Sequence, residues 1–303
     1  MGACAQSSQR DVTILRVVIR PATWDDLEGV FDLLSARNRA VFGISDLRFE
    51  HLRIDWELPS FTVGADNWVA VEGAHLIGYA ALGASHTLVH AAADPGDGDE
   101  LLARVVARAR ELGATTLQVT ASSHDEALVE LAQRHGFALE TETIRMWKTL
   151  RGDDPPPAWP GGVAVRTYEP RDAEAVHSLL IEAYSAWDAR YVPLPHDDWV
   201  AWMTSDEEFD PAAWFLAERD GELVACALYW STGWLKDIAV RASERGRGLG
   251  KALLLRGFGE FTRRGAQRIG LKVDAANPTG AIQLYERHGY VADRREGVWT
   301  LCL

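Results

Sequence analysis

The sequence repeats itself once, and this repeat constrains the fold more than any other feature of the 303-residue chain. Three segments recur in the same order with drifting offsets: Ile19 to Leu34 as Val165 to Leu180, Trp68-Val-Ala as Phe215-Leu-Ala, and Arg134-His-Gly-Phe137 as Arg287-His-Gly-Tyr290. Such a pattern indicates a duplicated domain, and the length suits two domains of about 150 residues.

The boundaries of the two copies follow from composition. Residues 1–13 are small and polar and are expected to form a flexible tail, and the first copy runs over residues 14–150. Residues 151–162 contain three consecutive prolines and end on Gly161-Gly162, which is typical of a semi-rigid linker with a hinge. The second copy covers residues 163–303.

A glycine-rich turn in the second copy indicates an anion site. A predicted strand at Ile238-Ala239-Val240 leads into Glu244-Arg-Gly-Arg-Gly-Leu-Gly-Lys251, which opens a helix. Helix N-termini leave N–H groups unpaired and carry a partial positive charge, so a phosphate or pyrophosphate is the natural guest. The spacing fits neither a nucleotide P-loop nor the Gly-x-Gly-x-x-Gly dinucleotide motif. A glycine-rich turn without any ligand stays the alternative.

This turn resembles the Arg/Gln-x-x-Gly-x-Gly/Ala signature of the GNAT acyltransferases, with Arg245, Gly248 and Gly250 at the defining positions. Each copy also shows the element order of a GNAT domain: strand, helices, hairpin, then strand and helix in alternation. The predicted elements of the first copy include strands at 14–20, 68–71, 76–82, 116–120 and 144–150 and helices from 27, at 101–112 and at 126–135. The resemblance implies an α/β (α+β) fold of two tandem GNAT domains, each a mixed, mostly antiparallel twisted sheet flanked by helices.

The resemblance also implies acetyl-CoA as cosubstrate, without a metal. Its pyrophosphate would lie on the turn formed by Arg245, Gly246, Arg247, Gly248, Leu249, Gly250 and Lys251. Its pantetheine arm would pair with the backbone of Ile238, Ala239 and Val240, and the Val240 amide would polarise the thioester carbonyl. Asn277 would lie beside the cofactor, and its Asn-Pro sequence also favours an N-cap followed by Pro at N1.

Two residues are candidates for proton transfer. Tyr285 occupies the position where the family places the acid that protonates the leaving thiolate, and a core tyrosine on a helix face is the alternative. Asp237, three residues before Val240, could deprotonate the acceptor ammonium. A salt bridge to Lys236 explains Asp237 equally well.

The family's acceptor pocket lies between the first two helices of the domain and the last strands. Here the corresponding segments supply aromatic rings and a carboxylate that suit a partly apolar amine: Tyr184, Trp187, Asp188, Tyr191 and Trp199. A plain hydrophobic core explains the same residues. The architecture is similar to that of mycothiol synthase, whose acidic residue on this strand falls where this chain has Trp234, so the identical acceptor is one alternative among several.

The first copy lacks these features. At the offset of 153, Ala132 stands where the second copy has Tyr285, and His124 where it has Asn277. The stretch Asp94-Pro-Gly-Asp-Gly-Asp-Glu100 carries four carboxylates where the second copy has its cationic turn. We therefore expect the first copy to have lost ordinary CoA binding, because carboxylates repel a pyrophosphate.

Composition removes other classes of function. The net charge of −13 argues against nucleic acid as the main partner. The three cysteines lie far apart with no CxxC pair, which argues against a zinc site or a disulfide framework and favours a reducing, cytoplasmic location. No window suits a signal peptide or a membrane span. The leading hypothesis is an acetyl-CoA-dependent N-acetyltransferase of a small-molecule amine, monomeric or homodimeric. A non-catalytic acyl-CoA or metabolite-binding sensor of the same fold, a mycothiol-synthase-like enzyme and a protein N-acetyltransferase are the alternatives.

Overall fold

The computed structural model describes residues 16–83, 87–92 and 95–303, so the tail predicted for residues 1–13 lies outside the described residues. The strands are β1 (Val17–Pro21), β2 (Asn67–Glu72), β3 (His75–Gly83), β4 (Thr87–Ala92), β5 (Thr116–Ala121), β6 (Ala138–Thr149), β7 (Val163–Thr167), β8 (Trp214–Arg219), β9 (Glu222–Tyr229), β10 (Trp234–Val240), β11 (Arg268–Asp274) and β12 (Val291–Cys302). The helices are α1 (Leu27–Phe42), α2 (Phe49–Glu57), α3 (Pro95–Glu111), α4 (Glu126–Arg134), α5 (Ala173–Ser185), α6 (His196–Thr204), α7 (Leu249–Arg263) and α8 (Ala281–Arg287).

Alternating side chains give each half of the sheet two cores. In the C-terminal half, Phe215 and Ala217 of β8 face the core beneath α7 and α8, whereas Trp214 and Leu216 face the core beneath α5 and α6. The N-terminal half repeats this arrangement, with α3 and α4 on one face and α1 and α2 on the other. Successive side chains of a strand point to opposite faces, which produces the two layers of helices. The predicted fold class, a mixed sheet with helices on its faces, is confirmed.

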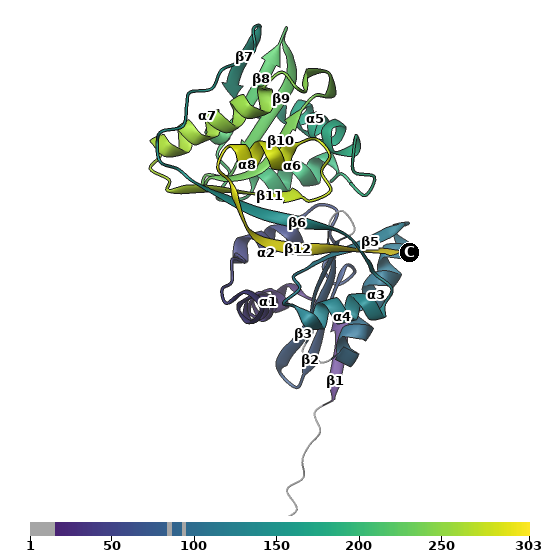
Figure 1. Cartoon of the computed structure of the whole chain (residues 1–303). Helices are drawn as coiled ribbons and strands as arrows, with labels where there is room; N and C mark the ends of the chain where they lie inside the picture. Colours follow the sequence, from purple (N-terminus) through teal and green to yellow (C-terminus); the bar gives the residue numbers. More distant parts are fainter. Residues whose placement is uncertain (1–15, 84–86, 93–94) are drawn as a thin grey trace, which may run out of the picture.

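The two halves share one sheet, which the sequence pattern does not predict. Its twelve strands follow the order β1-β2-β3-β4-β5-β12-β6-β11-β10-β9-β8-β7, and the pairs β4–β5 and β10–β11 are parallel. Figure 1 shows the N-terminal half below and the C-terminal half above, with β6 and β12 crossing between them.

The last strand of each half belongs to the sheet of the other half. β12 lies between β5 and β6, and β6 pairs along its other edge with β11. Met146 of β6 consequently packs into the core of the C-terminal half, and Leu301 of β12 packs against that of the N-terminal half. The exchange makes each half depend on the other for its completed sheet.

Three element boundaries differ from the sequence predictions by more than one residue. α3 begins at Pro95 and not at Leu101, because a proline is well tolerated at the first helical position, where no intrahelical N–H bond is required. β6 begins at Ala138 and not at Ile144, because β12 pairs with it from Ala138 to Trp147, whereas β11 pairs with it from Thr143 to Thr149. The predicted strand at 14–20 begins at Val17 within the described residues.

A close approach between strands holds the two halves together. The rings of Trp147 on β6 and Trp234 on β10 meet at 5.4 Å, with Gly270 of β11 beneath them. A Cβ atom on Gly270 would lie 2.6 Å from the Trp147 ring and 2.8 Å from the Trp234 ring, so only a glycine fits there. Trp234, at the position where the mycothiol synthase resemblance would place an acid, is thus a packing residue of the junction.

Candidate active site

A split between two parallel strands forms the centre of the site. β10 and β11 are paired at two positions, Trp234 and Leu235, and a bulge after Leu235 bends β10. From Asp237 to Val240, β10 is in register with β9 and with no other strand of the described chain. A cleft of about 870 Å³ lies along this edge of β10.

The backbone of β10 presents polar groups to this cleft. The Arg241 N–H donates to the Val224 carbonyl at 2.9 Å, which fixes the direction of the groups before it. Because antiparallel strands alternate the side to which they direct their backbone groups, the N–H and C=O groups of Ile238 and Val240 face away from β9 and into the split. The Arg245 side chain donates to the Val240 carbonyl at 3.2 Å. The other N–H and C=O groups of Ile238 and Val240 can form hydrogen bonds with an extended ligand, as they would with another strand.

The glycine-rich turn ends at the N-terminus of α7, at one end of the same cleft. Gly246 and Gly248 have φ angles of 74° and 89°, a left-handed conformation that L side chains rarely adopt. A Cβ atom at either position would meet nothing within 4 Å, so the approach to the backbone is open. The first N–H groups of α7 therefore lie beside accessible space, as an anion site requires.

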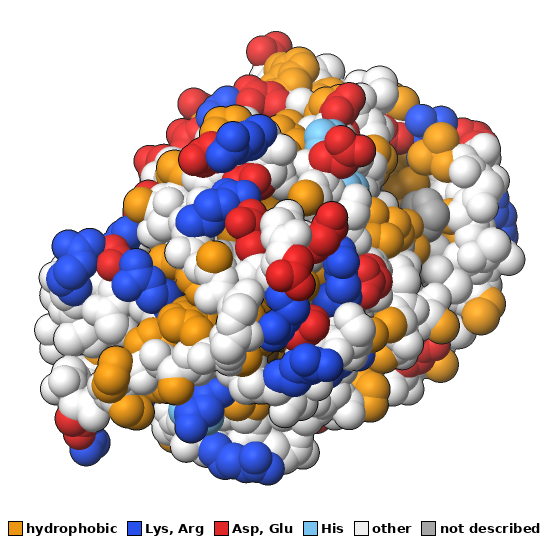
Figure 2. Space-filling model, turned by 90° about the horizontal axis from the view of Figure 1, so that it is seen from above, with side chains coloured by type: hydrophobic (Ala, Val, Ile, Leu, Met, Phe, Trp, Pro, Cys, Tyr) orange, Lys and Arg blue, Asp and Glu red, His pale blue; other side chains and the backbone are white. Residues whose placement is uncertain are grey.

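The charges around the turn favour an anion. Arg245 and Lys251 line the cleft, whereas Arg247 is not among the lining residues. The nearby acid, Glu244, is buried, with its carboxylate 3.3 Å from Arg219 and 3.7 Å from Arg247. Figure 2, seen from above the view of Figure 1, shows Lys and Arg side chains interspersed with Asp and Glu over that face of the molecule. The turn is therefore locally cationic in a chain of net charge −13.

Asn277 lines the cleft, but it does not cap a helix as its sequence suggested. α8 begins at Ala281 with Gly280 as the preceding residue. The Asn277 side-chain oxygen instead accepts hydrogen bonds from the backbone N–H of Thr279 at 2.9 Å and from its hydroxyl at 2.5 Å. The N-cap interpretation is wrong because this local turn competes successfully with the helix for the Asn277 side chain.

Asp237 lies just after the bulge, with its carboxylate held from two sides. The Tyr184 hydroxyl donates to it at 2.9 Å, and the Lys236 ammonium lies 3.4 Å from its other oxygen. Burial, and then the negative charge of Asp237, raise the pKa of Tyr184 well above its ordinary value, so Tyr184 keeps its proton and serves as a donor. The predicted salt bridge to Lys236 is thus present together with access to the cleft.

Tyr285 reaches the same cleft from α8. Its side chain is almost fully buried and its ring packs 5.7 Å from that of Tyr290. Burial, and then the charge of Asp237, raise the pKa of Tyr285 above its ordinary value of 10.0. Within the described chain no protein group forms a hydrogen bond with its hydroxyl, so this proton is available to a guest in the cleft. Tyr285 is therefore both a buried core residue and part of the cleft lining, so the two interpretations are compatible.

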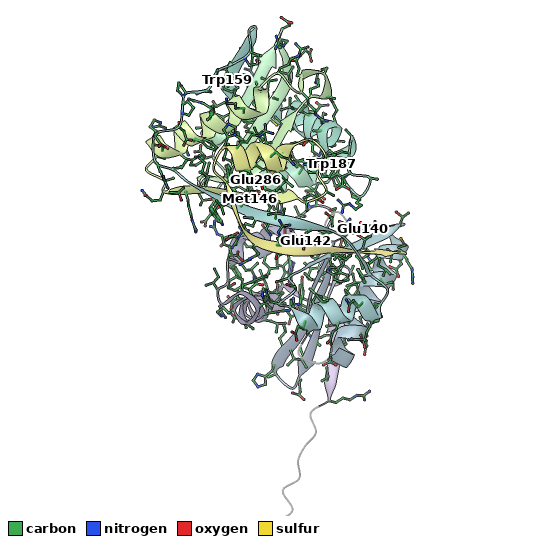
Figure 3. The ribbon with its side chains drawn as sticks, in the orientation of Figure 1. Glu140, Glu142, Met146, Trp159, Trp187 and Glu286 are labelled. Atoms are coloured by element: carbon green, nitrogen blue, oxygen red, sulfur yellow. The ribbon has the colours of Figure 1, made fainter. Side chains whose placement is uncertain are left out.

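The residues predicted for the acceptor divide between the cleft and its surroundings. Tyr184, Trp187, Asp188 and Tyr191 line the cleft, and the rings of Tyr184 and Tyr191 lie 5.3 Å apart. Figure 3 shows Trp187 in the C-terminal half and Glu140 on β6 below it in this view. Trp199 lies in the core beneath α5 and α6 and lines a second, neighbouring cavity.

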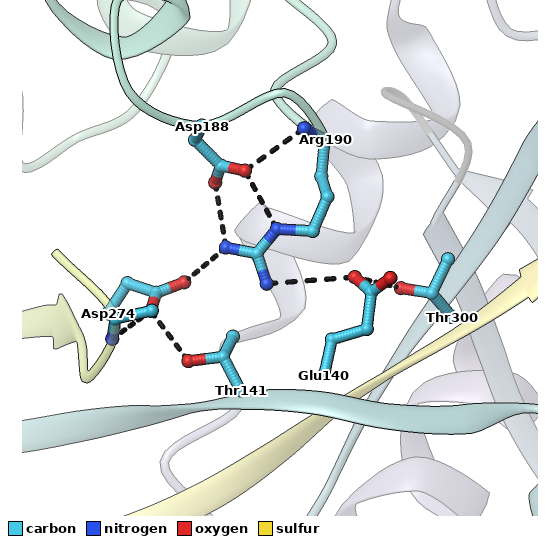
Figure 4. Close-up of polar contacts among 7 residues, drawn as sticks. Glu140, Thr141, Asp188, Arg190, Asp274 and Thr300 are labelled. Carbon is cyan, nitrogen blue, oxygen red and sulfur yellow. Dashed lines mark hydrogen bonds and ion pairs between the residues drawn. The ribbon is translucent and has the colours of Figure 1, made fainter.

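Arg190 fixes the loop that carries these acceptor residues. Its guanidinium binds Asp188 at 2.7 Å and Asp274, at the end of β11, also at 2.7 Å, and it lies 3.8 Å from Glu140 of β6 (Figure 4). Thr141 donates to the other oxygen of Asp274 at 2.7 Å. The network connects the loop to β6, the exchanged strand. The Asp188 carboxylate is already paired with Arg190. Sequence reasoning missed Arg190 because two of its partners, Asp274 and Glu140, are distant in the chain.

A second cavity, of about 490 Å³, lies between the two halves. It shares Tyr184, Tyr191, Lys236 and Asp237 with the cleft, so the two spaces adjoin at these four residues. Most of its remaining walls come from the N-terminal half and are apolar. No local sequence signal could have identified these residues, because the cavity exists only where the halves pack.

The N-terminal half has a similar split but not the same turn. β4 and β5 share the single pair Thr87↔Gln118. β4 ends at Ala92 and α3 begins at Pro95, which leaves two intervening residues, whereas residues 241–248 separate β10 from α7. The predicted acidic stretch is thus mostly the first turns of α3, with Asp94 outside the described residues. Asp99 is ion-paired with Arg134 at 2.7 Å, which weakens the expected repulsion.

Comparison with known proteins agrees with this geometry. Residues 173–290 match the Acetyltransferase (GNAT) family. A mycothiol acetyltransferase of Thermobispora bispora is 32% identical, over 91% of this chain and 96% of the relative. One from Streptomyces coelicolor is 31% identical over 74% of this chain and 75% of the relative.

Solved structures extend the likeness over both halves. A GCN5-related N-acetyltransferase from Sphaerobacter thermophilus superposes with a TM-score of 0.73 at 25% identity, covering 94% of this chain and 95% of its own. A tandem GNAT protein from the clavulanic acid biosynthesis pathway has a TM-score of 0.67 at 18% identity, covering 95% of this chain and 98% of its own. The second likeness concerns the fold alone.

Proposed function

The chain belongs to the tandem GNAT acetyltransferases and is an acyltransferase, and we propose that its C-terminal half transfers an acetyl group from acetyl-CoA to the amine of a small molecule. One observation carries this proposal: the free edge of β10, the cationic turn, Asp237 and Tyr285 all border a single cleft. A donor and an acceptor held in one cleft can react without a covalent intermediate on the protein.

The residues present fit acetyl-CoA. The backbone of Ile238 and Val240 offers an extended edge for the pantetheine arm, and the start of α7 offers N–H groups and the charges of Arg245 and Lys251 for the pyrophosphate. The Val240 N–H is aimed into the split, where it can stabilise negative charge on the thioester oxygen. Acetyl-CoA would supply the activated acetyl group, and Arg247, outside the cleft lining, would contribute through its charge alone.

Asp237 is the proposed base. The acceptor arrives as an ammonium ion and must lose a proton before its nitrogen lone pair can attack. Asp237 lines both the cleft and the second cavity, and the Tyr184 hydrogen bond fixes the orientation of its carboxylate. It can accept the proton directly or through one water molecule.

Tyr285 is the proposed acid. Formation of the C–N bond and rupture of the C–S bond leave a thiolate, which is released more readily when it receives a proton. The raised pKa of Tyr285 keeps its hydroxyl protonated at neutral pH, and the hydroxyl lies in the cleft with no protein partner among the described residues. A protonated hydroxyl without a protein partner can donate its proton to a thiolate formed beside it.

We expect one acetyl-CoA to bind per chain. The N-terminal half has two residues between β4 and α3, too few to form the wide turn that opens before α7. Isothermal titration calorimetry should give a stoichiometry near one, and Lys251→Glu should weaken this binding by placing a carboxylate at the turn. Two equivalent sites per chain would contradict the assignment.

Release of free CoA thiol from acetyl-CoA, measured against a panel of primary amines, tests the function itself. We expect amine-dependent thiol release, with the acetylated amine detected by mass spectrometry in equal amount. The matched control is the thiol release without amine. Acetyl-CoA binding without turnover of any amine in the panel would favour a sensor built on the same fold.

A further inference from the structure

The second cavity is lined in part by the proposed base, Asp237. It has a volume of about 490 Å³, within the range of about 300–1,000 Å³ that is usual for small-molecule sites. Lys236 and Asp237 belong to both spaces, so an amine nitrogen at Asp237 can extend its substituent into the cavity. The cleft on the other side is then left to the acyl donor.

The walls of this cavity are apolar and come from both halves. The N-terminal half contributes Leu47, Leu52, Trp56 and Phe61, and the C-terminal half contributes Met203 from α6. Among the lining residues, Asp55, Lys236 and Asp237 are the charged ones. Apolar walls favour an apolar guest by about 0.8 kcal/mol for each CH₂ group removed from water, which corresponds to a three- to fourfold change in affinity.

Several polar groups of the cavity already have partners. The Trp202 ring N–H donates to Asp55 at 3.0 Å, and the Trp56 ring N–H donates to the Tyr79 hydroxyl at 3.0 Å. Lys236 lies 4.9 Å above the Trp202 ring. A polyhydroxylated guest would lose its hydrogen bonds to water and find few replacements here, which costs binding free energy. An alkyl or aryl guest loses no such bonds.

We propose that the acceptor is an amine with an apolar alkyl or aryl body, which occupies the cavity between the halves while its nitrogen lies at Asp237. This inference rests on the proposed acetyl transfer and assigns to the N-terminal half the recognition of the acceptor. The duplicated half thus serves as one wall of the acceptor site.

A chain-length series tests the proposal. With n-propylamine, n-hexylamine and the polyhydroxylated D-glucosamine as acceptors, we expect kcat/KM to rise about three- to fourfold per CH₂ from propyl to hexyl, with glucosamine the poorest of the three. Equal kcat/KM for propyl and hexyl, or a preference for glucosamine, would overturn it.

Variants that fill or enlarge the cavity provide a second test of the proposal. Leu47→Trp adds bulk in the loop between α1 and α2, and we expect kcat/KM for n-hexylamine to fall about tenfold with little change for n-propylamine, since only the longer chain reaches that wall. Phe61→Ala should move the optimum to longer amines. Leu112→Trp, at an exposed position outside the cavity lining, is the control and should change neither. Equal losses for both amines in Leu47→Trp would contradict the cavity assignment.

Different results would contradict the proposed acetyl transfer and the assignment of the cavity. If no amine is acetylated, the proposed function fails, and calorimetry of n-hexylamine with the CoA-saturated protein decides the cavity assignment alone. Weaker binding to Leu47→Trp than to wild type then supports the cavity as an apolar amine site. Equal affinity for the two proteins, or binding to neither, overturns it.

Discussion

Replacement of Tyr285 by phenylalanine is expected to lower kcat by about 10²-fold or more, with the Kd of acetyl-CoA changed by less than about twofold. The ring packing against Tyr290 is retained, whereas the proton for the leaving thiolate is lost. Steady-state thiol release gives kcat, and calorimetry gives the Kd. Because burial and the charge of Asp237 raise the pKa of Tyr285 above 10.0, ionisation of this phenol should not reduce wild-type activity up to about pH 9.

Tyr290→Phe is the matched control. Tyr290 is a neighbouring buried tyrosine that is absent from the cleft lining, and its hydroxyl has no hydrogen-bond partner among the described residues. Removal of an unpartnered buried hydroxyl is nearly neutral or stabilising, so kcat should be unchanged. A normal kcat in Tyr285→Phe would remove this residue from the acid role, and an equal loss in both variants would indicate altered packing.

Replacement of Asp237 by asparagine is expected to lower kcat/KM at neutral pH by about 10²- to 10⁴-fold. The substitution keeps the shape of the side chain and an oxygen that can accept the Tyr184 hydrogen bond, but removes the base. The deficit should shrink as the pH rises towards the pKa of the acceptor amine, because a growing fraction of the amine is then already deprotonated. A pH profile of kcat/KM for both proteins measures this.

Two further variants separate the role of Asp237 from general electrostatics. Asp197→Asn removes a carboxylate whose side chain is 91% exposed on α6, and it should leave the profile unchanged. Tyr184→Phe removes the donor that orients Asp237 and should give a smaller loss than Asp237→Asn. A deficit in Asp237→Asn that stays constant over the pH range would argue against proton removal by this carboxylate.

The cofactor half of the candidate site could be read from the sequence because its parts are close together in the chain. Ile238 to Lys251 contains the strand edge, the glycines with left-handed φ angles and the start of α7 within fourteen consecutive residues. Local conformational preferences determine the backbone structure of such a segment. Asn277 marks the limit of those preferences, since its side chain satisfied a local turn in preference to the helix.

The acceptor half of the candidate site could be predicted from the sequence only in part. The aromatic residues after α5 were identified, but Trp199 turned out to line the neighbouring cavity, and Asp188 is bound by Arg190. Arg190 itself meets Asp274 and Glu140, from strands more than forty residues away in either direction. Side-chain composition indicates which groups are available, whereas long-range packing determines which of them stay accessible.

The sequence by itself determined the duplication and the cationic turn before α7, because each depends on repeated segments or on residues adjacent in the chain, and its GNAT resemblance implied the mixed sheet flanked by helices. Only the tertiary structure decided that β6 and β12 exchange between the halves and that an apolar cavity forms beside Asp237. The two copies have similar strand patterns, so each sheet can accept either terminal strand by local criteria. The choice between them depends on contacts such as Trp147 with Gly270 and Trp234, which arise only when distant segments are brought together.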